Sequence, residues 1–304
     1  MTNNNKTHYA AKKKISIWYF INLIKSQLLL IAMFAVAIGI LDQLPAFQKI
    51  SLPLAIPALV GTAVSLLLAF RISQSYERWW EARTIWGAIV NDSRTFIRQI
   101  TQALPSGSET IIQEFAQRQI IWNYALGESL RKLPFSDRVQ DYLIDHRIEA
   151  TNIPNALLDE HSLQLKQLAD KGLISEFRLI QLNETLARLC DSMGKCERIK
   201  NTVFPRSYSI LVHSLIYVFA AILPFGFDDS QLSLLIIEIG ITILIPTLFI
   251  AIEKTAIIMQ DPFENTPVDT PMTSLAQTIE INLREMIGEQ NVPQKKRNPL
   301  YYEM

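Results

Sequence analysis

The sequence predicts an all-α integral membrane protein with four membrane-spanning helices and a helical cytoplasmic domain. Three observations predict this fold class. Four apolar runs are each about 20 residues long, which is the length that a helix needs to cross a bilayer. Lysine and arginine residues gather on one side of these runs. Between the second and third runs, apolar residues recur at helical spacing, and no stretch shows a sustained strand alternation.

The first two runs predict a transmembrane hairpin over residues 26–73. Residues 28–41 are uncharged and apolar, and extension of this run to 26–44 gives roughly 28 Å of helix at about 1.5 Å per residue. Residues 52–70 again carry no charge, and only one threonine and one serine interrupt their apolar character. A short turn joins the two runs, so we expect the two helices to be antiparallel neighbours.

The last two runs predict a second hairpin over residues 207–252. In the run 207–227 the titratable residues are His213 and two tyrosines, and the run 232–252 is interrupted only by Glu238. The alternative is that all four runs are buried helices of a large soluble protein. Apolar runs of this length, with so few charged residues, are more typical of membrane spans than of core helices.

The positive charges predict that both termini and the segment 74–206 lie in the cytoplasm. Short cytoplasmic segments of membrane proteins carry an excess of Lys and Arg. The two short outer turns contain one such residue, Lys49. The charges on the other side of the first hairpin are Lys6, Lys12, Lys13, Lys14, Lys25, Arg71, Arg78 and Arg83. The terminal segments 1–25 and 253–304 are therefore expected to be cytoplasmic.

The segment 74–206 is predicted to be a helical cytoplasmic domain. Its apolar residues recur with the period of amphipathic helices. The expected breaks between these helices lie near Pro105, Pro134, Pro154 and Gly172. After the fourth span we expect one further amphipathic helix over about 273–286, followed by a polar tail.

Charge balance and missing motifs exclude several function classes. The 29 Lys and Arg residues balance the 29 Asp and Glu residues, so no basic surplus indicates a nucleic-acid partner. The sequence has no phosphate-binding loop, no dinucleotide fingerprint, no nucleophile elbow and no zinc-protease motif. Its four histidines and two cysteines lack metal-ligand spacing. We therefore expect no enzymatic activity, no cofactor and no metal site.

Several segments, in the right order along nearly the whole chain, resemble the bestrophin family. They are Tyr76-Glu77-Arg78-Trp79-Trp80-Glu81-Ala82-Arg83, Ile85-Trp86-Gly87, Gly194 to Ile199, Leu223-Pro224-Phe225-Gly226 and Asp261-Pro262-Phe263. The resemblance implies a homopentamer around one central pore, with four spans per subunit. It also implies that the protein lies in the bacterial cell inner membrane and passively conducts small monovalent ions.

The resemblance also implies which residues line the pore. Thr62, Leu66 and Phe70 lie at i, i+4 and i+8 on one face of the second span, about 6 Å apart in rise, and they match the pore neck of the family. Narrow apolar collars resist wetting and so gate or select ions. Ile180 matches the aperture at the cytosolic exit. From periodicity alone, the three neck residues would pack in a bundle or face lipid, and Ile180 would be a core residue.

The sequence does not decide whether the pore selects anions or cations. Necks rich in phenylalanine present positive ring edges that favour anions, but here only Phe70 is aromatic and Thr62 adds a hydroxyl. Anions such as chloride are expected from the family, and a sodium-conducting channel of the same fold is the alternative. A membrane-anchored scaffold or signalling protein is the alternative of another class.

Glu238 is a further candidate site residue, because a carboxylate inside a span is costly unless it meets water or a partner. It either lines the outer vestibule of the pore or pairs with His213 of the third span.

Overall fold

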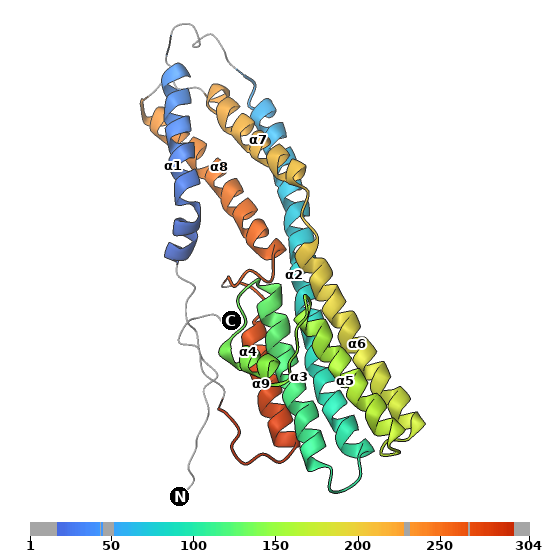
Figure 1. Ribbon diagram of the computed structural model, residues 1–304. Coiled ribbons are helices and arrows are strands. Elements are labelled where there is room, and N and C mark those ends of the chain that lie inside the picture. The colour runs from blue at the N-terminus through green and yellow to red at the C-terminus, as the bar shows by residue number, and fades with distance from the viewer. Residues whose placement is uncertain (1–16, 43, 45–51, 228–231, 267, 295–304) are drawn as a thin grey trace, which may run out of the picture. The chain divides into compact units, whose positions relative to one another are not determined.

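The computed structural model describes residues 17–42, 44, 52–227, 232–266 and 268–294, and within these ranges it contains helices and no strand (Figure 1). The all-α prediction is confirmed for this part of the chain. The helices are α1 (Ile17–Asp42), α2 (Ala55–Ala103), α3 (Glu109–Leu130), α4 (Asp137–Asp145), α5 (Ile153–Asp170), α6 (Glu176–Asn201), α7 (Arg206–Ile222), the 3-10 helix η1 (Pro224–Gly226), α8 (Leu232–Gln260) and α9 (Met272–Met286). The charges at Lys6, Lys12 to Lys14 and Lys49, on which the predicted topology depends, lie outside the described residues.

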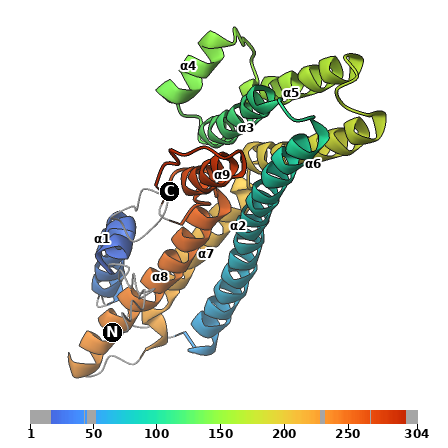
Figure 2. The same ribbon diagram turned by 90° about the horizontal axis from the view of Figure 1, so that it is seen from below.

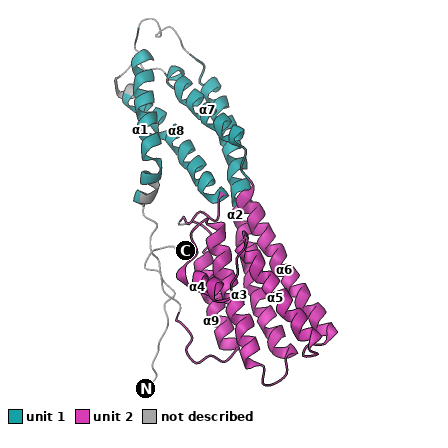
Figure 3. Ribbon diagram, viewed as in Figure 1, with its two compact units in different colours: residues 1–77, 203–260 teal, residues 78–202, 261–304 magenta. Residues whose placement is uncertain are grey.

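The chain divides into two compact units (Figure 3). Unit 1 comprises residues 1–77 and 203–260, and unit 2 comprises residues 78–202 and 261–304. Helix α2 contributes its first part to unit 1 and its second part to unit 2. The two units are defined by their compactness and not by the position of a membrane. The predicted boundaries between membrane-spanning and cytoplasmic segments therefore stay a prediction.

Unit 1 packs α1, the first part of α2, α7 and α8 around a small apolar core. Its buried members are Ile31, Val64, Leu68, Val212, Ile216 and Ile250. Helix α1 lies beside α8 in both views (Figure 1, Figure 2). Gly61 lets α7 approach α2 closely, since a Cβ atom there would lie 2.9 Å from the ring of Phe219. Large apolar side chains are exposed on each of these helices, among them Leu29, Leu59, Ile210 and Leu248, as expected of helices in contact with lipid.

Three of the described helices are long and apolar enough to cross a membrane on their own, namely α1, α2 and α8. Helix α7 has 17 residues, which is shorter than the required length. It reaches that length only if it is counted together with α6, and residues 202–205 separate the two helices. The third predicted span, 207–227, is thus helical only to Ile222. The physical reason is Pro224, which has no amide hydrogen for a helical bond and is followed by the turn η1. The count of four spans stays a prediction.

Unit 2 is a helical bundle with large buried aromatic residues, among them Trp86, Phe96, Phe115 and Trp122. Helix α9 lies beside α3 (Figure 1, Figure 2), and α3, α5 and α6 pack in succession. The indole nitrogen of Trp122 donates to the carbonyl of Pro154 at 3.0 Å. Pro154 itself lies in the first turn of α5, where its missing N–H group leaves no helical bond broken.

Candidate ion-conduction site

The predicted neck residues Thr62, Leu66 and Phe70 form an exposed strip along α2. Leu66 and Phe70 are each 57% exposed in the subunit, and Thr62 is also exposed. The hydroxyl of Thr62 donates to the carbonyl of Ala58 at 2.8 Å. Val64, on another face of the same helix, is fully buried in the core of unit 1. The strip is therefore left uncovered by the fold of its own subunit.

Ile180, the predicted aperture residue, lies on α6 of unit 2. Helix α6 begins after Ser175, whose side chain caps it by accepting a hydrogen bond from the amide of Arg178. Ile180 is 59% exposed, and Phe177, one turn earlier, is 87% exposed. Ile180 is thus a surface residue of unit 2 and not part of its core.

Glu238 lies on α8 and is 4% exposed. Its burial within unit 1 favours a packing role over a position in an outer vestibule, because a vestibule carboxylate would face water. His213, the partner considered for it, has its Nδ1 atom 3.1 Å from Oε2 of another carboxylate, Glu253. The vestibule role of Glu238 stays a prediction.

Sequence reasoning missed a charge cluster in unit 1, which consists of the buried Arg71 and Glu253 and the partly exposed His213. The Nη1 atom of Arg71 lies 2.9 Å from Oε1 of Glu253, and the side chains of these two residues are 1% and 0% exposed. The guanidinium carbon of Arg71 also lies 5.3 Å and 5.9 Å from the ring centres of Phe204 and Tyr208. Such aromatic faces further stabilise a cation that has been withdrawn from water.

One signal in the sequence could have revealed the pair of Arg71 and Glu253. Each residue stands in the first turn beyond a predicted span, and the two spans are predicted to end at the same side of the membrane. Opposite charges at matching depth are candidates for pairing, because an unpaired charge there is costly. The Lys and Arg distribution uses Arg71 only as one of the charges that predict the topology.

Comparison with known proteins assigns the family. A family model described as "Bacterial/Fungal Bestrophin protein" matches residues 16–285. The chain belongs to the bestrophin family. The protein is 30% identical over 303 residues to "Voltage-dependent anion channel-forming protein YneE" of Escherichia coli strain K12, with 96% of each chain covered. It is also 30% identical to "Voltage-dependent anion channel-forming protein RSc3414" of Ralstonia nicotianae, with 76% of each chain covered.

Solved structures agree with this assignment. A crystal structure of a bacterial bestrophin homologue from Klebsiella pneumoniae is 26% identical, superposes with a TM-score of 0.79, and covers 88% of this chain and 100% of that chain. A structure described as that of a membrane protein superposes with a TM-score of 0.80 at 26% identity and covers 88% of this chain. Together with its apolar helices, these matches identify this bestrophin as a multi-pass membrane protein.

The aromatic and arginine motif that resembles bestrophins makes structural contacts within unit 2. Arg78 donates to the carbonyls of Ile199 and Thr202, the latter at 2.7 Å, and so satisfies carbonyl groups at the end of α6. Trp79 donates its indole N–H to the carbonyl of Val268 at 2.7 Å. The motif therefore fastens α2 to the end of α6 and to the segment that leads into α9.

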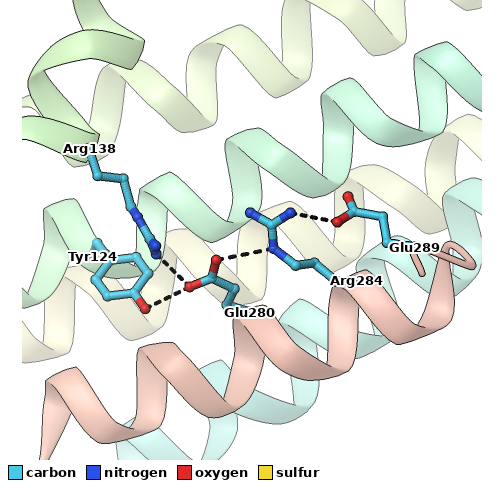
Figure 4. Close-up of polar contacts among 5 residues, drawn as sticks. All are labelled: Tyr124, Arg138, Glu280, Arg284 and Glu289. Atoms are coloured by element: carbon cyan, nitrogen blue, oxygen red, sulfur yellow. Dashed lines mark hydrogen bonds and ion pairs between the residues drawn. The ribbon is translucent and has the colours of Figure 1, made fainter. Parts of the chain in front are cut away.

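A second charged network holds α9 to α3 and α4 (Figure 4). Buried Glu280 accepts from Tyr124 at 2.8 Å and from Arg138 at 2.5 Å on one oxygen, and from Arg284 at 3.1 Å on the other. Burial opposes ionisation of Glu280, but the donors Arg138 and Tyr124 and the charges of both arginines outweigh it and lower its pKa. Arg284 also donates to Glu289 at 2.5 Å, which ties the segment after α9 to the same network.

His161 is fully buried in unit 2. We therefore expect the helical bundle of unit 2 to lose stability in acid. The ring of His161 lies 4.9 Å and 5.4 Å from the ring centres of Phe96 and Phe115, and its Nδ1 atom lies 3.4 Å from Nη1 of Arg118. Burial, and then the charge of Arg118, lower the pKa of His161 well below its usual range. The imidazole is therefore neutral in the folded protein at neutral pH.

We expect this bestrophin to lose stability as the pH falls below about 6.5, where unfolded histidine gains a proton that folded His161 does not bind. The loss from this residue is about 1.4 kcal/mol per pH unit until the folded pKa is reached. Thermal unfolding of detergent-solubilised protein between pH 7.5 and 5, followed by tryptophan fluorescence, measures it. The variant His161→Phe should show a shallower decline, and an unchanged slope would contradict the assignment.

Proposed function

We propose that this bestrophin is a passive ion channel that conducts small anions such as chloride through a central pore formed by several copies of the chain. The observation that carries the proposal is the exposed strip of Thr62, Leu66 and Phe70 on α2, a helix that also contributes to the core of unit 1. Membership of the bestrophin family, together with relatives named as channel-forming proteins, supports a channel and not an enzyme.

The pore belongs to a homo-oligomer, to which we assign five subunits on the resemblance to bestrophins. Around a symmetry axis, the side chains of Thr62, Leu66 and Phe70 form three stacked collars about 6 Å apart in rise. A narrow collar of leucine and phenylalanine resists wetting, and an ion must lose part of its water shell to pass it. Exposed Ile180 supplies a second apolar ring at the cytosolic exit.

The choice of anions rests on two arguments. The curated relatives are named as anion channel-forming proteins. The edge of the Phe70 ring carries positive partial charge, which favours an anion in the neck. One observation favours the alternative, a monovalent-cation channel of the same fold that conducts sodium. Thr62 donates its hydroxyl hydrogen to Ala58, so its oxygen presents lone pairs to the pore.

The channel lies in the bacterial inner membrane, with spans within 26–73 and 207–252. Residues 1–25, 74–206 and 253–304 are cytoplasmic, as the Lys and Arg distribution predicts. Helix α7, with 17 residues, is about 26 Å long, and the turn η1 extends it toward the roughly 30 Å of a bilayer core.

Chloride flux into liposomes tests the proposal against a membrane-anchored scaffold. Purified protein is reconstituted into vesicles that contain a chloride-sensitive fluorophore, and vesicles prepared without protein serve as the control. We expect rapid quenching only in the protein-containing vesicles, because a pore needs no further component. Equal quenching in both samples would support the scaffold and reject the channel.

A further inference from the structure

A pocket of about 310 Å³ lies in unit 2 against the network around Glu280 (Figure 4). Its floor is one face of α9, on which Thr273, Gln277 and Glu280 follow one another at helical spacing. Its walls come from α3, from the start of α4 and from the segment 293–294. The volume is at the lower end of the range of ligand pockets, which is about 300 to 1,000 Å³.

Arg138 lines this pocket with a guanidinium that is held in place but not used up. Its Nη1 atom donates to Oε2 of Glu280 at 2.5 Å, and its guanidinium carbon lies 4.7 Å from the ring centre of Tyr124. The hydrogen bond and the ring together fix the plane of the group. The side chain is 44% exposed, and Nε and Nη2 remain for a further acceptor. A planar carboxylate can accept from two such nitrogens at once.

Glu128 of α3 brings a carboxylate to the same pocket. Its Oε2 atom accepts from the backbone amide of Ser136 at 3.0 Å, which holds it beside the start of α4. Among the ion pairs of the residues that the structure describes, Arg138 is joined to Glu280 and none includes Glu128. The pocket therefore contains a carboxylate and a guanidinium that do not neutralise each other.

The other polar groups of the lining need no charged ligand. Glu280 already accepts from Tyr124, Arg138 and Arg284. Thr273 accepts from Nη1 of Arg131 at 2.7 Å, so its own hydroxyl hydrogen can be donated. The charges that a ligand must satisfy are thus one negative and one positive.

A ligand with a single charge would satisfy one of the two side chains and withdraw the other from water without a partner, which is costly. A small zwitterion satisfies both and adds no net charge to the pocket. Ile281 and Pro293 are the aliphatic members of the lining, and Gln277 and Gln294 are neutral amides. We therefore expect an uncharged substituent between the two charged ends of the ligand.

We propose that this pocket binds a free α-amino acid, whose carboxylate accepts from Nε and Nη2 of Arg138 and whose ammonium group donates to Glu128. The bound amino acid joins α3, α4 and α9 with the segment 293–294. The inference goes beyond ion conduction and does not depend on it, because every residue that lines the pocket belongs to unit 2.

Isothermal titration calorimetry of the full-length protein in detergent tests this inference with three probes. L-Alanine carries both charges, propionate lacks the ammonium group, and ethylammonium lacks the carboxylate. We expect the wild type to bind L-alanine at least about tenfold more tightly than either of the other two, because each of them loses one set of charge-assisted hydrogen bonds.

Two conservative variants assign the two ends of the ligand. Glu128→Gln keeps an oxygen for the amide of Ser136 but has no charge, so it should bind L-alanine no more tightly than propionate. Arg138→Lys keeps a cation for Glu280 but lacks the planar fork, so it should bind L-alanine and propionate at least about tenfold more weakly. Glu184→Gln, which changes an exposed residue of α6, is the matched control and should bind as the wild type does.

Size-exclusion profiles verify that each variant is intact. If the wild type binds L-alanine no more tightly than propionate or ethylammonium, or does not bind it at all, the inference is overturned, whichever variants fold. Unchanged affinity of Glu128→Gln for L-alanine overturns it as well. Failure of the proposed channel would instead be seen as absent chloride flux, which calorimetry does not measure.

Discussion

Replacing Glu253 with alanine is expected to destabilise unit 1 by about 3 to 5 kcal/mol, since it leaves the guanidinium of Arg71 buried without its counter-charge. The two side chains are 1% and 0% exposed, so water does not take the place of the carboxylate. In addition, the Nδ1 atom of His213 loses its neighbour Oε2 of Glu253, which lies 3.1 Å away. The expected result is a melting temperature many degrees below that of the wild type, or loss of the folded protein on purification.

The control for this prediction removes both charges at once. The double variant Arg71→Met with Glu253→Gln leaves no buried ion and should recover most of the lost stability, because replacing a buried pair with neutral groups is often nearly neutral. Lys254→Ala, beside Glu253 in the sequence, should change the melting temperature little. Thermal unfolding in detergent compares the variants. Equal melting temperatures for Glu253→Ala and the wild type would show that the pair contributes little.

Replacing Leu66 with alanine is expected to raise chloride flux by about tenfold or more. Each subunit loses three carbon atoms from the collar, which widens it and lowers the barrier against water and ions. Each 1.4 kcal/mol taken from a barrier is about tenfold in rate. Flux into liposomes at matched protein content measures the change.

Leu244→Ala is the matched control for Leu66→Ala. Leu244 lies on α8 and is 57% exposed, as Leu66 is, but it has no place in the proposed neck. Its replacement should leave the flux at the wild-type value. If Leu244→Ala raises the flux as much as Leu66→Ala does, the change reflects a loosened helix bundle, and the neck assignment of Leu66 is wrong.

The sequence predicted the elements of this fold whose signal is local. The amphipathic helix expected over 273–286 is α9, Met272–Met286. The apolar runs overlap α1, α2, α7 and α8, although α2 continues without a break for 49 residues and α7 stops before Pro224. Helix α2 contains no proline after Pro57, whereas α7 ends before Pro224, which has no amide hydrogen for a helical bond.

Contacts between distant segments could not be predicted in the same way. Arg71 and Glu253 are 182 residues apart, and helical periodicity does not tell which residues of two helices meet. The same holds for Glu280, whose partners come from α3, α4 and its own helix. For the neck, periodicity placed Thr62, Leu66 and Phe70 on one face, and only the resemblance to bestrophins supplied a reason to direct that face to a pore.

The reversal potential of the wild-type protein in a planar bilayer tests the central claim most directly. Under a tenfold KCl gradient at neutral pH, an anion channel reverses its current near the chloride equilibrium potential, about 59 mV from zero. We predict a reversal potential close to that value. A reversal potential of the opposite sign, near the potassium equilibrium potential, would contradict the anion channel and assign the neck to cations.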